Sequence, residues 1–190
     1  MSPSHARPRP LARSYTKLYP VPQAQWVPRT SSADDRDGLY PFDPIAFRFV
    51  NPRDGKISTG VPLAYLDENV YPNAAGTVGD VIVDAGEKVF KDASRAYLRI
   101  LWPGYEHVEF VTSVPLRGVG GRVTRGQLAL FIVRTVKQYF TTLQSAHCLP
   151  TQKAWTVAPA GRWRVEDLVL VALHLVHGNT FQAEFKVDTE

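Results

Sequence analysis

The sequence contains a single cysteine, Cys148, and it lacks long apolar runs. One cysteine cannot form an internal disulfide, which fits a reducing compartment. The longest apolar stretches are interrupted at Arg134 and His174, well short of the ~20 residues that a membrane-spanning helix needs. No apolar segment follows the first arginines, as a secretory signal peptide requires. We therefore expect an intracellular protein, cytoplasmic or nuclear, that does not associate with membranes.

Acidic residues are absent from residues 1–33, which carry five basic ones: Arg7, Arg9, Arg13, Lys17 and Arg29. This region has a charge of +5, and the other 17 basic and 18 acidic residues sum to −1. The rest of the chain is almost neutral, which argues against a fold dedicated to nucleic-acid binding. Five charges predict at most a weak, salt-dependent association of nucleic acid with the basic region, and a solvated leader without a function is the alternative.

The same region is poor in aliphatic residues and rich in proline, with six of the fifteen prolines in residues 1–28. Proline fixes φ, removes a hydrogen-bond donor and holds the preceding residue extended. Few aliphatic side chains are present to offset the entropy of ordering. We expect residues 1–38 to be a disordered tail that does not join the core, with Trp26 and Val27 as a candidate anchor. Residues 39–190 are expected to form a single domain, long enough to bury a core.

The clearest predicted helix follows Thr124-Arg125-Gly126-Gln127, which matches a capping box. Apolar side chains then recur at helical spacing: Leu128, Phe131, Ile132, Val136, Tyr139, Phe140 and Leu143. Residues 77–89 also show helical spacing, after a weaker capping pattern that begins at Thr77. Gly79 and Gly86 each disfavour that helix by ~1 kcal/mol relative to alanine.

Two hairpins are predicted from alternating residues on either side of a turn. Residues 95–102 and 107–116 flank Pro103-Gly104, and residues 168–176 and 180–187 flank a second turn. In the second hairpin, alternation places one set of side chains toward the core, Phe181, Ala183, Phe185 and Val187, and another toward solvent, Gln182, Glu184 and Lys186. A helix over residues 166–175 is the alternative, because its apolar residues also fit 3.6 spacing. The order of elements predicts an α+β fold, an antiparallel sheet with about two helices packed on one face.

Two motifs give the chain a resemblance to a known family. The turn Trp102-Pro103-Gly104-Tyr105 is followed by the helix start Thr124-Arg125-Gly126-Gln127-Leu128. This combination resembles a family of uncharacterised proteins from mushroom-forming (basidiomycete) fungi, and the likeness covers roughly residues 61–187. In that family tryptophan is commoner than phenylalanine at the position of Phe181. The resemblance implies a fungal source and a fold outline, and it carries over no site residues because the family has no assigned activity.

The sharpest candidate site is an anion-binding loop that leads into the predicted long helix. A helix start presents free N–H groups and a partial positive charge, and glycines allow the backbone to approach an anion. Arginines nearby can bind phosphate or carboxylate in a forked geometry. The candidate residues are Arg117, Gly120, Gly121, Arg122, Thr124 and Arg125. The pattern lacks the Gly-Lys-Ser/Thr of a P-loop, and a flexible loop with solvated arginines before a capped helix is the alternative.

Other polar groups do not form a catalytic or metal-binding pattern. His174 and His177 point to opposite faces if they lie on a strand, so they cannot hold one metal ion together. A bystander thiol explains Cys148 better than a nucleophile does. Solvated turn positions explain Glu106 and Glu109 as well as an acid/base pair does. We expect no catalytic residue, metal ion or cofactor.

A good core without catalytic residues favours a non-enzymatic protein-interaction or scaffold module. A sheet edge or an aromatic patch would hold a protein partner, a second copy of the chain included, although most aromatic side chains are expected in the core. The alternative is a small-anion binder, or an enzyme, that uses residues 117–125. A third reading is non-specific nucleic-acid association through the basic tail.

Overall fold

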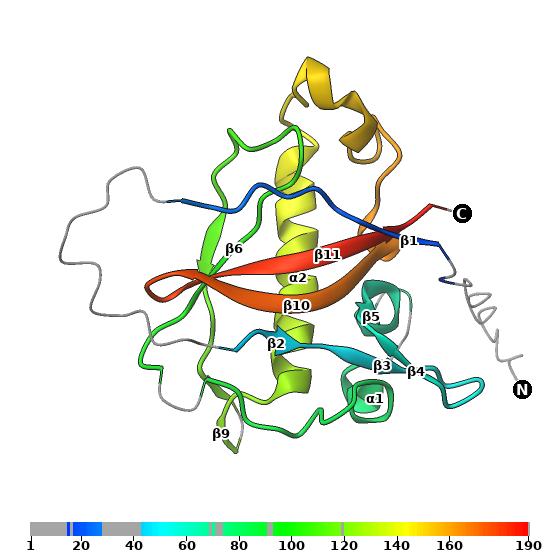
Figure 1. The fold of residues 1–190 in the computed structure, drawn as a ribbon, viewed down its shortest axis with the longest axis vertical. Coiled ribbons are helices and arrows are strands. Elements are labelled where there is room, and N and C mark those ends of the chain that lie inside the picture. The colour runs from blue at the N-terminus through cyan, green and yellow to red at the C-terminus, as the bar shows by residue number, and fades with distance from the viewer. Residues whose placement is uncertain are drawn as a thin grey trace, which may run out of the picture.

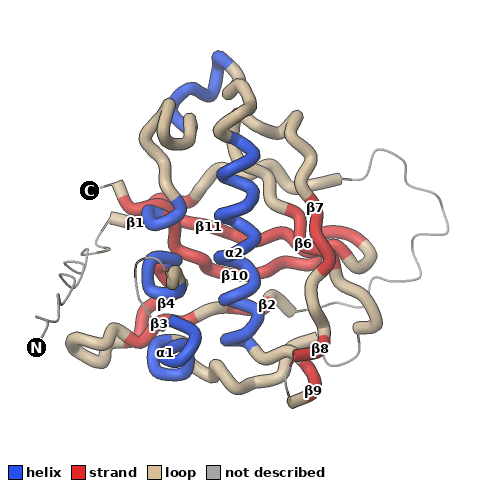
Figure 2. Tube along the Cα trace, turned by 180° about the vertical axis from the view of Figure 1, so that it is seen from behind, coloured by secondary structure: helices blue, strands red, loops and turns tan. Residues whose placement is uncertain are grey.

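The computed structural model describes residues 15, 17–27, 43–68, 70, 74–90, 93–118 and 120–189. Within them the chain forms an α+β fold, in which a seven-stranded sheet carries a long helix across one face (Figure 1, Figure 2). The sheet is antiparallel apart from one parallel pair of strands. This confirms the predicted fold class. The predicted tail residues 1–14, 16 and 28–38 lie outside the described residues.

A long antiparallel hairpin forms the centre of the sheet. Its strands are β10 (Leu168–His177) and β11 (Thr180–Asp188), so the prediction of strand, and not helix, at residues 168–176 is confirmed. Alternation along β11 places one set of side chains in the core, as predicted: Phe181, Ala183, Phe185 and Val187. Two shifts in register, between Leu170 and Ala172 and between Leu175 and His177, mark bulges in β10.

Short strands extend this hairpin on both sides. The free side of β10 pairs with β2 (Ile45–Ala46) and β5 (Val61–Pro62). The other side of β11 pairs in parallel with β6 (Tyr97–Arg99), and β7 (Val111–Ser113) lies beyond β6. The predicted hairpin about Pro103-Gly104 is therefore present as β6 and β7.

Two small hairpins and several short 3-10 helices surround the sheet. The hairpins are β3 (Arg48–Val50) with β4 (Ile57–Thr59), and β8 (Arg117–Gly118) with β9 (Gly121–Arg122). The 3-10 helices are Leu63–Leu66, Pro150–Trp155 and Val165–Asp167. Of the 3-10 helices, Leu63–Leu66 and Val165–Asp167 contribute buried residues to the core.

Helix α2 (Arg125–Leu143) is the longest helix and covers the inner face of the sheet, as Figure 2 shows from its own side. The predicted capping box is present: the Thr124 hydroxyl accepts from the Gln127 N–H, and the Gln127 side chain accepts from the Thr124 N–H. Its apolar stripe packs on the core, with Leu128, Ile132 and Val136 fully buried. No helix of the described residues has both the length and the apolar character to cross a membrane.

Helix α1 (Ala74–Val81) differs from its prediction at both ends. It begins at Ala74, so Thr77 lies within the helix and the capping pattern predicted there is wrong. It ends at Val81 because Ile82 bridges to Phe49 and Asp84 takes a positive φ of 56°, which an α-helix does not accommodate. The chain then turns through residues 83–86 and reaches Lys88, which bridges to Thr124.

The turn at Trp102–Tyr105 is a packed corner of the core. Both rings are buried, and the Trp102 indole N–H donates to the Trp155 carbonyl at 2.7 Å. The Tyr139 hydroxyl accepts from the Trp102 main-chain N–H at 3.3 Å. Burial raises the pKa of Tyr139 far above its usual value, and burial also raises the pKa of Tyr105. The expectation that most aromatic side chains belong to the core is confirmed for this group.

The largest difference from the sequence analysis lies in residues 18–27, which we call the strap. Its first residues form β1 (Leu18–Pro20), which pairs with the end of β11, and Val21 is buried in the core (Figure 1, blue). The prediction that residues 1–38 stay apart from the core is therefore wrong for this segment. Proline is compatible with the strand because β1 is an edge strand, where one side needs no N–H donors.

Candidate functional site

The predicted anion loop is a small hairpin whose donors mostly contact the protein itself. Arg117 pairs with Arg122 across β8 and β9, and Gly120 and Gly121 take positive φ angles of 91° and 113° in the turn. The Arg122 guanidinium donates to the Phe90 carbonyl at 3.2 Å and to a second carbonyl, of Ala93, at 2.7 Å. Arg122 therefore ties its hairpin to the main chain at Phe90 and Ala93.

The N–H groups at the start of α2 also have protein acceptors. The Arg125 N–H donates to the Glu87 carbonyl at 2.8 Å, and the Gly126 N–H donates to the Ala85 carbonyl at 2.9 Å. The Gln127 N–H is taken by the Thr124 cap. These contacts use the donors that helix starts offer to anions.

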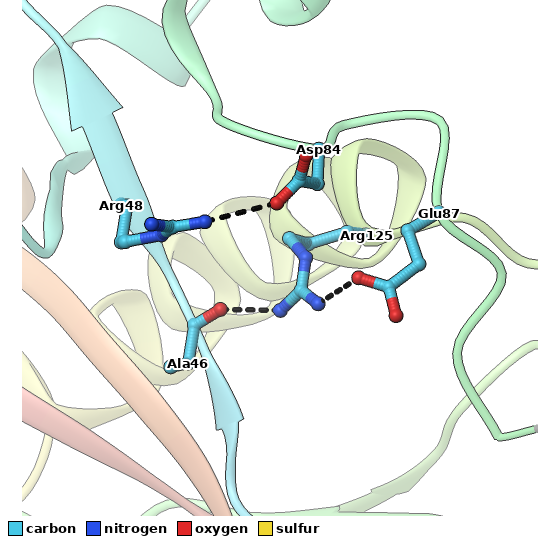
Figure 3. A network of polar contacts seen from close by, with 5 residues as sticks. All are labelled: Ala46, Arg48, Asp84, Glu87 and Arg125. Carbon is cyan, nitrogen blue, oxygen red and sulfur yellow. Dashed lines mark hydrogen bonds and ion pairs between the residues drawn. The ribbon is translucent and has the colours of Figure 1, made fainter. Parts of the chain in front are cut away.

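The Arg125 side chain ties three segments together (Figure 3). Its guanidinium donates to the Ala46 carbonyl of β2 and pairs with the Glu87 carboxylate. Beside it, Arg48 pairs with Asp84 at 2.9 Å, and these two side chains are more than half exposed. Arg122, Thr124 and Arg125 are thus each engaged by partners within the protein. Anion binding at residues 117–125 stays a prediction, and it would require rearrangement of these contacts.

The two histidines of β10 lie on one face of the sheet, contrary to expectation. His174 pairs across the hairpin with Gln182 and contacts Glu184 at 2.8 Å, whereas His177 pairs with Thr180. The bulge between Leu175 and His177 changes the alternation, so both imidazoles reach the outer face, opposite α2. The described residues contain no group of three or more metal-binding side chains.

The outer face of the sheet holds the strap. From β1 the strap continues across this face, beside β11 and away from α2 (Figure 1, Figure 2). The Val21 N–H donates to the Phe185 carbonyl of β11 at 3.0 Å. The Gln23 side chain donates to the Leu101 carbonyl at 2.9 Å. The strap is therefore held both by β11 and by the segment that follows β6.

Gln182 binds the main chain of the strap at two points. Its amide nitrogen donates to the Ala24 carbonyl at 2.9 Å, and its amide oxygen accepts from the Trp26 N–H at 3.0 Å. Gln182 is 7% exposed, so both polar ends of a buried amide are satisfied by alternate residues of one extended segment. This arrangement recognises backbone atoms and not side chains.

Trp26 completes the contact at the far end of the strap. The Arg99 guanidinium lies 4.4 Å from the centre of its ring, and the His177 ring meets it edge-on at 5.8 Å. The side chain of Arg99 is 11% exposed and also lies 3.9 Å from Glu109. The predicted anchor is therefore Trp26 alone, because Val27 is 71% exposed.

A hollow of about 330 Å³ is lined by residues of both the strap and the hairpin. One wall comes from Val21, Gln23 and Gln25, and the other includes His174, Gln182 and Glu184. We call the surface formed by Arg99, Leu101, His177, Gln182 and Phe185 the strap groove. The sequence does not predict the strap groove, because Gln182 alternates with core residues and is therefore expected to face solvent.

No protein-family model, curated protein or solved structure matches this chain.

Proposed function

We propose that this protein is a protein-interaction module whose strap groove binds an extended segment beside β11. In the structure, residues 18–27 of the same chain, the strap, occupy this groove. The observation that carries the proposal is the Gln182 amide, which holds the Ala24 carbonyl and the Trp26 N–H at 2.9 and 3.0 Å. Addition of an extended segment to a sheet, with main-chain contacts for affinity and a few pockets for specificity, is a common mode of peptide recognition.

Apart from the Gln23 hydrogen bond to Leu101, the described side-chain contacts of the strap lie at two positions. Val21 is buried at the core edge, and Trp26 packs on Arg99 and His177. Tyr19 and Val27 are more than half exposed. The hollow of about 330 Å³ beside the strap leaves room for larger side chains at the positions of Gln23 and Gln25. The groove would therefore select a small aliphatic residue five positions before an aromatic one.

The composition of the strap favours replacement over further growth of the sheet. Pro20 and Pro22 have no N–H to offer to another strand on the outer side. Among the described residues, few apolar side chains of the strap are buried, which is typical of segments that open locally at low free-energy cost. A partner segment would enter the groove in place of the strap.

The proposal is tested with a labelled peptide of residues 15–27 and full-length variants of the chain. Val21→Asp with Trp26→Ala disables the strap, because a charge at a buried position is costly and the ring is lost. Fluorescence anisotropy should show that the peptide binds this variant more tightly than the parent. Circular dichroism establishes that the variant is folded.

Matched controls separate the groove from general surface effects. Adding Gln182→Ala to the strap variant should abolish peptide binding, whereas Gln138→Ala, on an exposed position of α2, should leave it unchanged. A peptide with Trp26→Ala should bind at least several-fold more weakly. A folded strap variant that binds no peptide contradicts the proposed function.

A further inference from the structure

We infer that the occupant supplied from outside is the strap of a second copy, so that two chains exchange residues 18–27 and form a dimer. This inference rests on the proposed function of the groove. In the exchanged form, Trp26 of one copy would pack on Arg99 of the other, and each groove would be completed by its partner chain. Both copies then give and receive the same contacts.

Complementarity between strap and groove is already present in one chain. The Val21 position, the Gln182 amide and the Arg99–Trp26 contact fit this segment, and a second copy carries the same sequence. Exchange changes no contact within the groove, so only chain entropy and any new contact near the connection distinguish the two forms. A second copy is therefore the partner whose fit the structure displays.

The described side-chain hydrogen bonds of the strap reach partners far away in the sequence. Three described side-chain hydrogen bonds hold the strap, and the two residues of each bond are separated in the sequence by 78, 156 and 158 positions. Residues 28–42 connect it to the rest of the domain and can reach about 50 Å when fully extended. A connection of that length is long enough to carry the strap to the groove of a neighbouring molecule.

Reciprocal exchange closes after two chains. Each copy has one strap and one groove, so a pair of copies satisfies both in a two-fold arrangement. Pro20 and Pro22 lack the N–H groups that an additional strand would pair with on the outer side of the strap. The expected product is a dimer and not an open polymer. Because exchange joins two molecules whereas closure occurs within one chain, the dimer fraction should rise with protein concentration.

A complementation experiment with two full-length variants tests the exchange. One copy carries Val21→Asp and Trp26→Ala, which leaves its groove intact, and the other carries Gln182→Ala, which leaves its strap intact. Neither variant should dimerise alone. Their mixture should form a heterodimer. The dimer fraction measured by light scattering, and the amount of partner recovered by pull-down with different affinity tags, should be several-fold higher than for either variant alone.

The outcomes separate the inference from the function on which it rests. Peptide binding without a heterodimer overturns the exchange and leaves the peptide-binding function standing. Loss of both overturns both. A parent dimer that persists in the strap variant alone shows association through another surface and also overturns the exchange. Gln138→Ala in place of Gln182→Ala gives a control mixture in which the control copy also dimerises by itself.

Discussion

Gly104 occupies a position in the core corner where a side chain has no room. Its φ is +80°, and a Cβ there would lie 2.7 Å from the Cys148 sulfur and 2.8 Å from the Gln152 Cβ. Gly55 has a similar φ of +69°, but nothing lies within 4 Å of its Cβ position. Both glycines therefore have a φ that would strain any other residue, and they differ in crowding.

Gly104→Ala should lower the free energy of unfolding more than Gly55→Ala does. Backbone strain of about 1–3 kcal/mol applies to both, and the steric clash adds to it only at Gly104. Chemical denaturation monitored by tryptophan fluorescence measures the difference, since Trp102 lies beside the corner. Equal losses in the two variants would show that crowding at Gly104 is relieved without cost.

Single residues also mark the limit of what the sequence could predict. The inward set of β11 followed from alternation, and so did the outward direction of Gln182. Alternation does not predict the burial of Gln182, because that burial depends on the strap, which is more than 150 positions away in the sequence. Arg122 and Arg125 show the same limit. Arginines beside glycines and a helix start predict an anion site, but in the structure their acceptors are protein groups from other loops.

Among the helices, two glycines allow a comparison of helix propensity with packing. Gly79 lies in α1 with nothing within 4 Å of its Cβ position, whereas a Cβ at Gly126 in α2 would lie 3.3 Å from the Ala85 side chain. Alanine favours a helix over glycine by about 0.5–1 kcal/mol. Of these two positions, Gly79 is the one where nothing opposes the gain in helix propensity.

Gly79→Ala should therefore raise the free energy of unfolding by about 0.5–1 kcal/mol. Gly126→Ala should give no such increase, because the added methyl group presses on the loop that caps α2. Thermal denaturation followed by circular dichroism measures both variants. An equal rise at the two positions would mean that the Ala85 loop moves freely, contrary to the tight contact described here.

Elements with strong local patterns were predictable, and those that depend on distant partners were not. Helix α2 followed from its capping box and apolar stripe, and the β10–β11 hairpin from alternation about a turn. The sequence does not indicate β1, because Pro20 and the prolines near it favour disorder locally and its partner is at the other end of the chain. Helix α1 was misplaced because glycines weaken its pattern and an Ile82–Phe49 bridge ends it.

The whole molecule should lose stability in alkaline solution because of its buried phenols. Burial raises the pKa of Tyr139 above its usual 10.0, and it raises the pKa of Tyr105 as well. The unfolded chain then loses these protons first as the pH rises past about 10, which favours unfolding. The contribution of the phenols is fully present below that pH and declines above it.

Tyr139→Phe should make the free energy of unfolding less sensitive to pH above about 10 than it is in the parent. The variant also loses the acceptor of the Trp102 N–H, so its stability near neutral pH should fall by about 1 kcal/mol or more. Denaturant titrations at a series of pH values measure both effects. Tyr19→Phe, at an exposed position, is the control and should follow the parent. Parallel curves for parent and Tyr139→Phe would contradict this account.

The Gln182 contact with backbone atoms also has a consequence for how such chains change over time. The Gln182 amide hydrogen-bonds to the main-chain carbonyl of Ala24 and the main-chain N–H of Trp26, so substitution of most strap side chains leaves this contact intact. Homologous chains are therefore free to drift there while keeping the interaction. What should persist is a spacing, an aliphatic residue five positions before an aromatic one, together with glutamine and arginine at the places of Gln182 and Arg99.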